Sequence, residues 1–153
     1  MRLQAEVIGL FEHAGDANRL LYTPLARPLT VRGTRRYMVD FTGDEQALKE
    51  FLAKVLADPV SHELRTGEEP ALSGQAFFLD YGMKAGALDH EKETILKLHR
   101  STPAAGFEIQ NLRINHRLYL FDAARSPDTP ELADRFVKDI VNPAIHTWQV
   151  TAA

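Results

Sequence analysis

Apolar residues recur at helical spacing in the closing part of each half of the chain. In the first half they are Leu48, Phe51, Leu52, Val55 and Leu56, and in the second half they are Leu132, Phe136, Val137 and Ile140. Each stripe predicts an amphipathic helix with one buried face. Asp58-Pro59 ends the first helix and Asn142-Pro143 ends the second, because the residue before a proline is pushed out of the helical conformation.

Shorter β-rich runs surround these helices. Strands are expected at residues 3–10, 36–41, 60–65, 75–84, 107–112, 117–122 and 144–150. The runs 107–112 and 117–122 are interpreted as two strands around Asn115-His116. Between the halves, residues 66–74 contain Gly, Pro, Ser and two Glu, which is typical of a polar connector.

A third helix is expected after Asp89, whose side chain suits an N-cap position. Its sequence places Ile95 and Leu98 on the inward face, and Pro103 is expected to close it. With this helix, the second half reads as β-α-β-β-α-β, which is the ferredoxin-like order.

The closing helix and strand of the first half reappear in the second. At an offset of 84 residues, Lys54 falls on Lys138, Pro59 on Pro143 and His62 on His146, and at an offset of 81 residues Arg36 falls on Arg117. We interpret this as a duplication. The predicted fold is α+β, with two tandem ferredoxin-like β-α-β-β-α-β repeats packed as a pseudo-dimer with antiparallel sheets. The first, divergent repeat is assigned to residues 1–66, the connector to 67–74 and the second repeat to 75–153.

Composition narrows the classes of function. The 153 residues include 18 basic and 21 acidic side chains, so the net charge of −3 provides no basic field for nucleic acid. Arg32, Arg35 and Arg36 are expected in a solvated turn. There is no cysteine, which excludes thiol nucleophiles and disulfides. No apolar run reaches membrane-spanning length and no leader pattern precedes residue 12, so we expect a cytoplasmic protein without membrane contact.

Motifs for cofactors and catalysis do not stand out. The phosphate-binding, dinucleotide-binding and nucleophile-elbow glycine patterns do not occur, and the six histidines lack metal-ligand spacing. We therefore expect no cofactor, no metal and no catalytic residue.

Three segments of the second half carry a family resemblance. They are Met-Lys-Ala-Gly-Ala-Leu-Asp at 83–89, Gly-Phe-Glu-Ile-Gln-Asn-Leu-Arg at 106–113 and Val-Asn-Pro-Ala-Ile at 141–145. This half resembles the PurS subunit family of phosphoribosylformylglycinamidine (FGAM) synthase. The first half keeps only Ala-Asp-Pro-Val at 57–60, and His90 stands where the family usually has proline.

The resemblance implies a tandem PurS-like chain, hence a non-catalytic ligase subunit in purine biosynthesis. Such a subunit would bridge the glutaminase and synthetase subunits of FGAM synthase, assist ammonia transfer and allow a homodimer. The partner-binding residues it implies are Lys84, Gly86, Leu88, Asp89 and Arg113.

Two other functions stay open. One is a tandem ferredoxin-like regulatory module that binds a small ligand in a polar-lined pocket between its halves. The other is an enzyme of the dimeric α+β barrel type, with His116 or His146 and a carboxylate in a cavity between two sheets.

Overall fold

A single antiparallel sheet carries all the helices on one face. The computed structural model describes residues 1–102 and 105–152. The strands are β1 (Arg2–Gly9), β2 (Gly15–Asp16), β3 (Leu29–Gly43), β4 (His62–Thr66), β5 (Phe77–Met83), β6 (Phe107–Asp122) and β7 (His146–Ala152). The helices are α1 (Glu45–Leu56), α2 (His90–Arg100) and α3 (Thr129–Ile140), with a short 3-10 helix at Ala17–Leu20. Within the described residues, no helix is long and apolar enough to cross a membrane.

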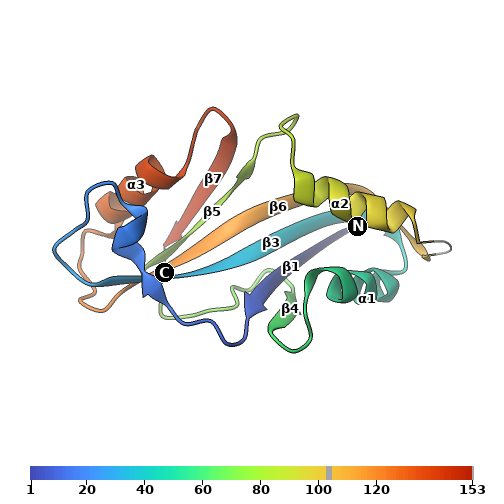
Figure 1. The fold of residues 1–153 in the computed structure, drawn as a ribbon, viewed down its shortest axis with the longest axis horizontal. Coiled ribbons are helices and arrows are strands. Elements are labelled where there is room, and N and C mark those ends of the chain that lie inside the picture. The colour runs from blue at the N-terminus through green and yellow to red at the C-terminus, as the bar shows by residue number, and fades with distance from the viewer. Residues whose placement is uncertain (103–104, 153) are drawn as a thin grey trace.

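The strand order is symmetric about the centre of the sheet. It runs β4-β1-β3-β6-β5-β7, with the short β2 also paired to β3 (Figure 1). Exchanging β1 with β5, β3 with β6 and β4 with β7 gives the same order, read from the opposite edge of the sheet. The long strands β3 and β6 pair along their whole length, from Leu29 opposite Asp122 to Gly43 opposite Phe107. Such an order is what the expected duplication would give.

The α+β class is as predicted, but the arrangement within it differs. Residues 107–112 and 117–122 belong to one strand, β6, which continues through Asn115 and His116. The intervening residues 113–116 include no glycine or proline, and β3 offers a backbone partner to each of them. Each half therefore has three main strands, and the halves join edge to edge instead of packing two sheets face to face.

Local signals explain the helix boundaries. Asp89 caps α2 as predicted, its carboxylate accepting a hydrogen bond from the Lys92 amide at 3.1 Å. Helix α3 begins with Thr129-Pro130, where the missing proline N–H is tolerated. Pro103, expected to end α2, lies outside the described residues.

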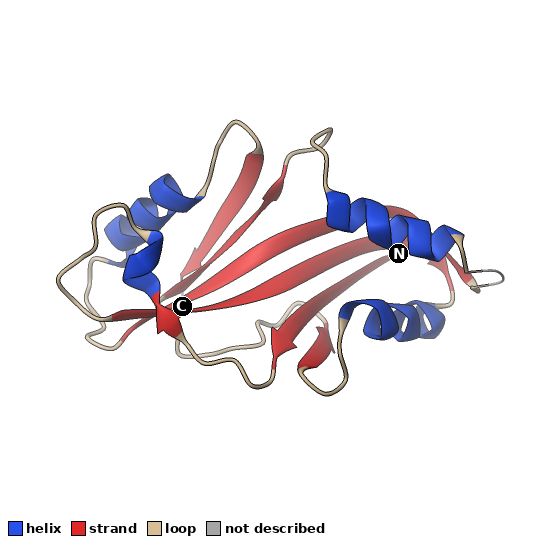
Figure 2. Ribbon diagram, viewed as in Figure 1, coloured by secondary structure: helices blue, strands red, loops and turns tan. Residues whose placement is uncertain are grey.

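Two apolar clusters cover opposite ends of β3 and β6. Figure 2 shows helices lying over both of these ends. The first contains Leu3, Val39, Phe41, Leu48 and Leu52 from the first half, with Ile95 and Leu112 from the second. The other contains Ala17 and Leu29 from the first half, with Phe77, Leu120, Leu132 and Phe136 from the second. Leu98, predicted to face inward, is instead 45% exposed, because it lies where α2 borders a groove. Both halves contribute to both clusters, so neither half has a core of its own.

The sheet face away from the helices holds a buried ion cluster. The Glu6 side chain accepts hydrogen bonds from Thr34 Oγ1 at 2.7 Å and Tyr119 Oη at 2.6 Å. It also forms ion pairs with Arg117 at 3.3 Å and Arg36 at 3.7 Å. Arg36 was expected in a solvated turn with Arg32 and Arg35; that prediction is wrong, since all three lie within β3.

The two arginines of this cluster differ in their surroundings. Burial, followed by the positive charge of Arg117, lowers the pKa of Arg36. Burial also acts to lower the pKa of Arg117, but hydrogen bonds from its guanidinium to Asp80 at 2.7 and 2.9 Å more than offset this and raise it. Arg36 also donates hydrogen bonds to Gln4 Oε1 at 2.6 Å and to the Gly67 carbonyl at 3.1 Å, but these acceptors are neutral. Its charge is therefore balanced mainly by Glu6, whereas Arg117 has a second carboxylate.

Candidate functional site

A groove of about 670 Å³ opens on the helix face, beside the middle of the long strands. Its floor comes from β1, β3 and β6, and its walls come from the end of α1 and from α2. The lining residues that carry polar chemistry are Glu12, Arg35, Tyr37, His62, Glu91, Thr94 and His116, and the apolar ones include Val7, Val55, Leu56, Ile95, Leu98 and Leu118. Elements of both halves therefore enclose the groove.

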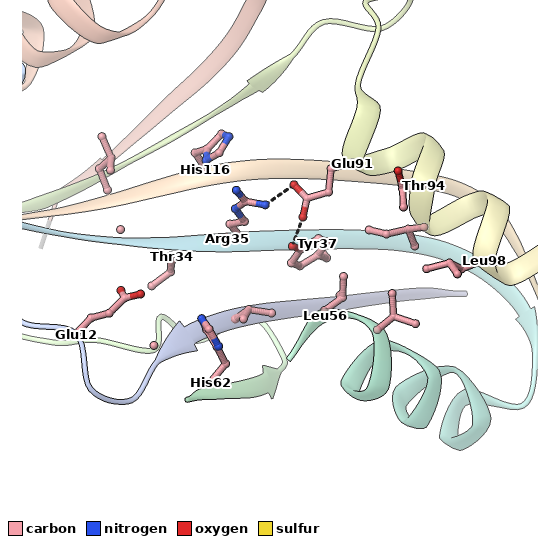
Figure 3. A pocket seen from close by; sticks show the side chains of 16 residues that line it. Glu12, Thr34, Arg35, Tyr37, Leu56, His62, Glu91, Thr94, Leu98 and His116 are labelled. Carbon is pink, nitrogen blue, oxygen red and sulfur yellow. Dashed lines mark hydrogen bonds and ion pairs between the residues drawn. The ribbon is translucent and has the colours of Figure 1, made fainter. Parts of the chain in front are cut away.

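Glu91 organises one side of the groove. The capped start of α2 places it in the first helical turn, directly across from β3. Its carboxylate accepts a hydrogen bond from Arg35 at 2.5 Å and another from the Tyr37 hydroxyl at 2.7 Å (Figure 3). Because Arg35 and Tyr37 are two residues apart on one strand, both side chains emerge on the same face of the sheet.

Charge states in this trio follow from its packing. Burial, reinforced by the hydrogen bond to Glu91, raises the pKa of Tyr37 far above its usual range. Burial acts to lower the pKa of Arg35, but the charge of Glu91 reverses this and raises it. At neutral pH Tyr37 is therefore a neutral donor and Arg35 a cation whose charge Glu91 balances.

Glu12 and His62 lie on the other side of β3 from Glu91 (Figure 3). Glu12 belongs to the loop after β1, and no cation within the described residues lies at ion-pair distance from its carboxylate. His62 begins β4, and its Nδ1 lies 2.9 Å from Ser61 Oγ. The acidic group left without a partner in the groove is thus Glu12.

The two histidines considered for catalysis lie against one tyrosine. The His116 ring stacks on Tyr81 and the His146 ring meets it edge-on, each at 5.3 Å between centroids. Burial, followed by the charge of Arg35, lowers the pKa of His116, which favours the neutral imidazole. The cavity between two sheets that this hypothesis needs does not occur, because the described strands form one sheet.

The predicted partner-binding residues lie mostly at a second, smaller cavity. Lys84, Gly86, Asp89 and Arg113 line a hollow of about 280 Å³ at the start of α2. Leu88, 64% exposed, does not line it. The fold thus brings four of the five residues together, although Arg113 comes from β6 and the other three from the loop between β5 and α2.

Of the polar residues that line the groove, sequence reasoning singled out His116 as a candidate and missed the trio of Arg35, Tyr37 and Glu91. Arg35 was assigned to a turn and Glu91 to a helix start, and nothing in the sequence connects the two. The alternation of Arg35 and Tyr37 in a β-rich run was the one available signal that both share a face. Within residues 1–102 and 105–152, no three His, Asp or Glu side chains are placed to hold a metal ion.

Comparisons with known proteins add no relative. No family model matches this chain, and neither curated proteins nor solved structures give a significant match.

Proposed function

We propose that this chain is a small-molecule-binding module and that the groove between α1 and α2 is its site. The observation that carries the proposal is a groove of about 670 Å³ enclosed by elements of both halves. Small-molecule sites in proteins have volumes of about 300–1,000 Å³ and combine apolar walls with a few convergent polar groups. The groove is lined by residues of both halves, which supports the proposal of a ligand bound between them.

The lining favours a ligand with an apolar body and a protonated amine. Val55, Ile95 and Leu98 offer apolar contact on the helical walls. The charge of Arg35 is already balanced by Glu91, whereas Glu12 has no cationic partner within the described residues. The charged side chains that line the groove therefore sum to a negative charge, which attracts a cation and disfavours a carboxylate.

The trio of Arg35, Glu91 and Tyr37 suits binding better than proton transfer. Arg35 and Glu91 hold each other's charges, and Tyr37 stays protonated because its pKa is raised. The three groups thus form a fixed frame of hydrogen bonds that shapes one end of the groove. A preorganised frame of this kind lowers the entropic cost of ordering a ligand.

A matched ligand series tests this proposal. Hexylamine, hexanol and hexanoate share one apolar body, and we expect hexylamine to raise the melting temperature most. At about 100 times its Kd, stabilisation of about 2.7 kcal/mol corresponds to roughly 5–10 °C for a chain of this size. Equal shifts from hexanoate, or no shift from any of the three, would contradict the proposal.

Glu12→Gln isolates the carboxylate. We expect about two- to fivefold weaker hexylamine binding by calorimetry, because an exposed charge pair contributes roughly 0.4–1 kcal/mol. Hexanol binding should not change. Glu69→Gln, an exposed carboxylate on the connector away from the groove, is the matched control.

A second candidate function rests on the smaller cavity. The convergence of Lys84, Gly86, Asp89 and Arg113 supports the proposal of a tandem PurS-like assembly subunit that contacts the glutaminase and synthetase subunits of FGAM synthase. We expect these two subunits to co-purify with the tagged chain from its native host, as identified by mass spectrometry. Lys84→Glu should abolish the complex, since Lys84 is exposed and its reversal leaves the core intact. Absence of both subunits from the purified material counts against this function.

A further inference from the structure

The two edges of the sheet are protected very differently. At one edge, β4 is five residues long and carries Glu63 and Arg65, which form an ion pair at 3.2 Å. At the other edge, β7 is seven residues long, His-Thr-Trp-Gln-Val-Thr-Ala, with no carboxylate, lysine, arginine or proline. Short, charged edge strands discourage pairing with another chain, whereas long, uncharged ones invite it. Within the described residues, β7 pairs only with β5.

Exposed apolar side chains gather along the same edge. Trp148 is 45% exposed and Val150 is 37% exposed, both on β7. Ile145, just before the strand, is 41% exposed, and Met83, which pairs with His146, is 38% exposed. An apolar patch beside an open strand edge is typical of an interaction surface.

The hydrogen-bonding pattern shows which backbone groups of β7 are free. The Lys84 amide donates to the Ile145 carbonyl at 2.8 Å, so these two residues form a hydrogen-bonded pair of the ladder. Because such pairs alternate along an antiparallel ladder, Thr147 and Gln149 also direct their backbone groups toward β5. Trp148 and Val150 therefore direct their N–H and C=O groups to the open edge.

We propose that β7 is a self-association edge, through which two copies of this chain join antiparallel strands into one continuous sheet. The twofold axis passes between the two Gln149 residues. In this register Trp148 lies opposite the second copy's Val150, and Thr147 lies opposite the second copy's Thr151. Each pair shares a face of the sheet, and every outward backbone group of Trp148 and Val150 finds a partner.

The strand is self-complementary in this register. Aromatic residues opposite β-branched ones, and threonine opposite threonine, are both favourable cross-strand pairs. No like charges meet, since β7 has no carboxylate, lysine or arginine. Because the strand pairs favourably with itself, we infer that a second copy of this chain binds at the β7 edge. The proposal is independent of the groove, because the groove lies beside α1 and α2 and not at β7.

A cysteine placed on the axis tests the register. The chain has no cysteine, so Gln149→Cys introduces a single thiol. Residues opposite each other in a non-hydrogen-bonded pair have Cα atoms about 4.5 Å apart, within disulfide range. We expect mild oxidation to give a covalent dimer of twice the 17.2 kDa chain mass. Thr151→Cys is the matched control, because its two copies lie about 13 Å apart along the strands and should not cross-link.

Charge substitution at the same position gives an independent readout. Gln149→Lys and Gln149→Glu should each be monomeric by light scattering, since like charges then face each other across the axis. Mixing the two variants should restore the dimer. The proposal is overturned if the unmodified chain is monomeric, or if the Gln149→Cys and Thr151→Cys variants cross-link equally. A monomeric chain whose β7 binds a strand of another protein also overturns it.

Discussion

Replacing Glu6 by methionine is expected to cost about 3–5 kcal/mol of unfolding free energy. Glu6 is fully buried and shares its carboxylate between Arg36 and Arg117. Without Glu6, Arg36 and Arg117 stay buried and Asp80 is the one carboxylate of the cluster that remains to balance their charges. Arg117 keeps its paired hydrogen bonds to Asp80, so the penalty falls mainly on Arg36. Urea unfolding followed by circular dichroism measures the effect.

A double substitution separates the lost charge pair from lost packing. If Arg36 becomes methionine together with Glu6, no uncompensated charge stays at that site, and much of the stability should return. The single Arg36→Met variant completes the cycle and gives the coupling energy. A loss below about 1 kcal/mol for Glu6→Met would mean that water reaches the cluster and replaces the carboxylate.

The sequence predicted those elements whose signals are local. Helices α1 and α3 were located well by the apolar stripes that contain Leu48 and Phe136 and by the proline that follows each helix. Amphipathic spacing and the backbone restriction before proline both act within a few residues. The Asp89 cap is local in the same sense. The continuity of β6 through Asn115 is not local, because it depends on β3 being long enough to pair with the whole strand.

The candidate site could be predicted less well, and for the same reason. The N-cap predicted at Asp89 implies that Glu91 lies in the first turn of the helix, but its partners Arg35 and Tyr37 lie 54 or more residues away along the chain. The buried role of Glu6 was equally invisible, since a carboxylate in an alternating strand normally faces water. Long-range pairing gives these residues their roles, and one sequence contains no record of it.

Replacing Phe136 by alanine is expected to cost about 3–5 kcal/mol and to destabilise both ends of the molecule together. Phe136 is fully buried and packs on Phe77, with 6.2 Å between ring centroids. Its cluster lies at one end of β3 and β6, while Leu3 lies in the cluster at the other end. Since the same two strands pass through both clusters, loss of one should weaken the other.

Hydrogen exchange distinguishes this shared fold from two independent ones. In Phe136→Ala, backbone amides near Leu3 should exchange faster by the same factor as those near Phe77, because both open through global unfolding. Phe11→Ala, at a site 73% exposed, removes the same side chain from the surface and should change stability by no more than about 0.5 kcal/mol. Unchanged protection near Leu3 would mean that each cluster folds alone. We expect the two clusters to unfold together because each contains residues from both halves. Neither half can therefore bury its apolar face without the other.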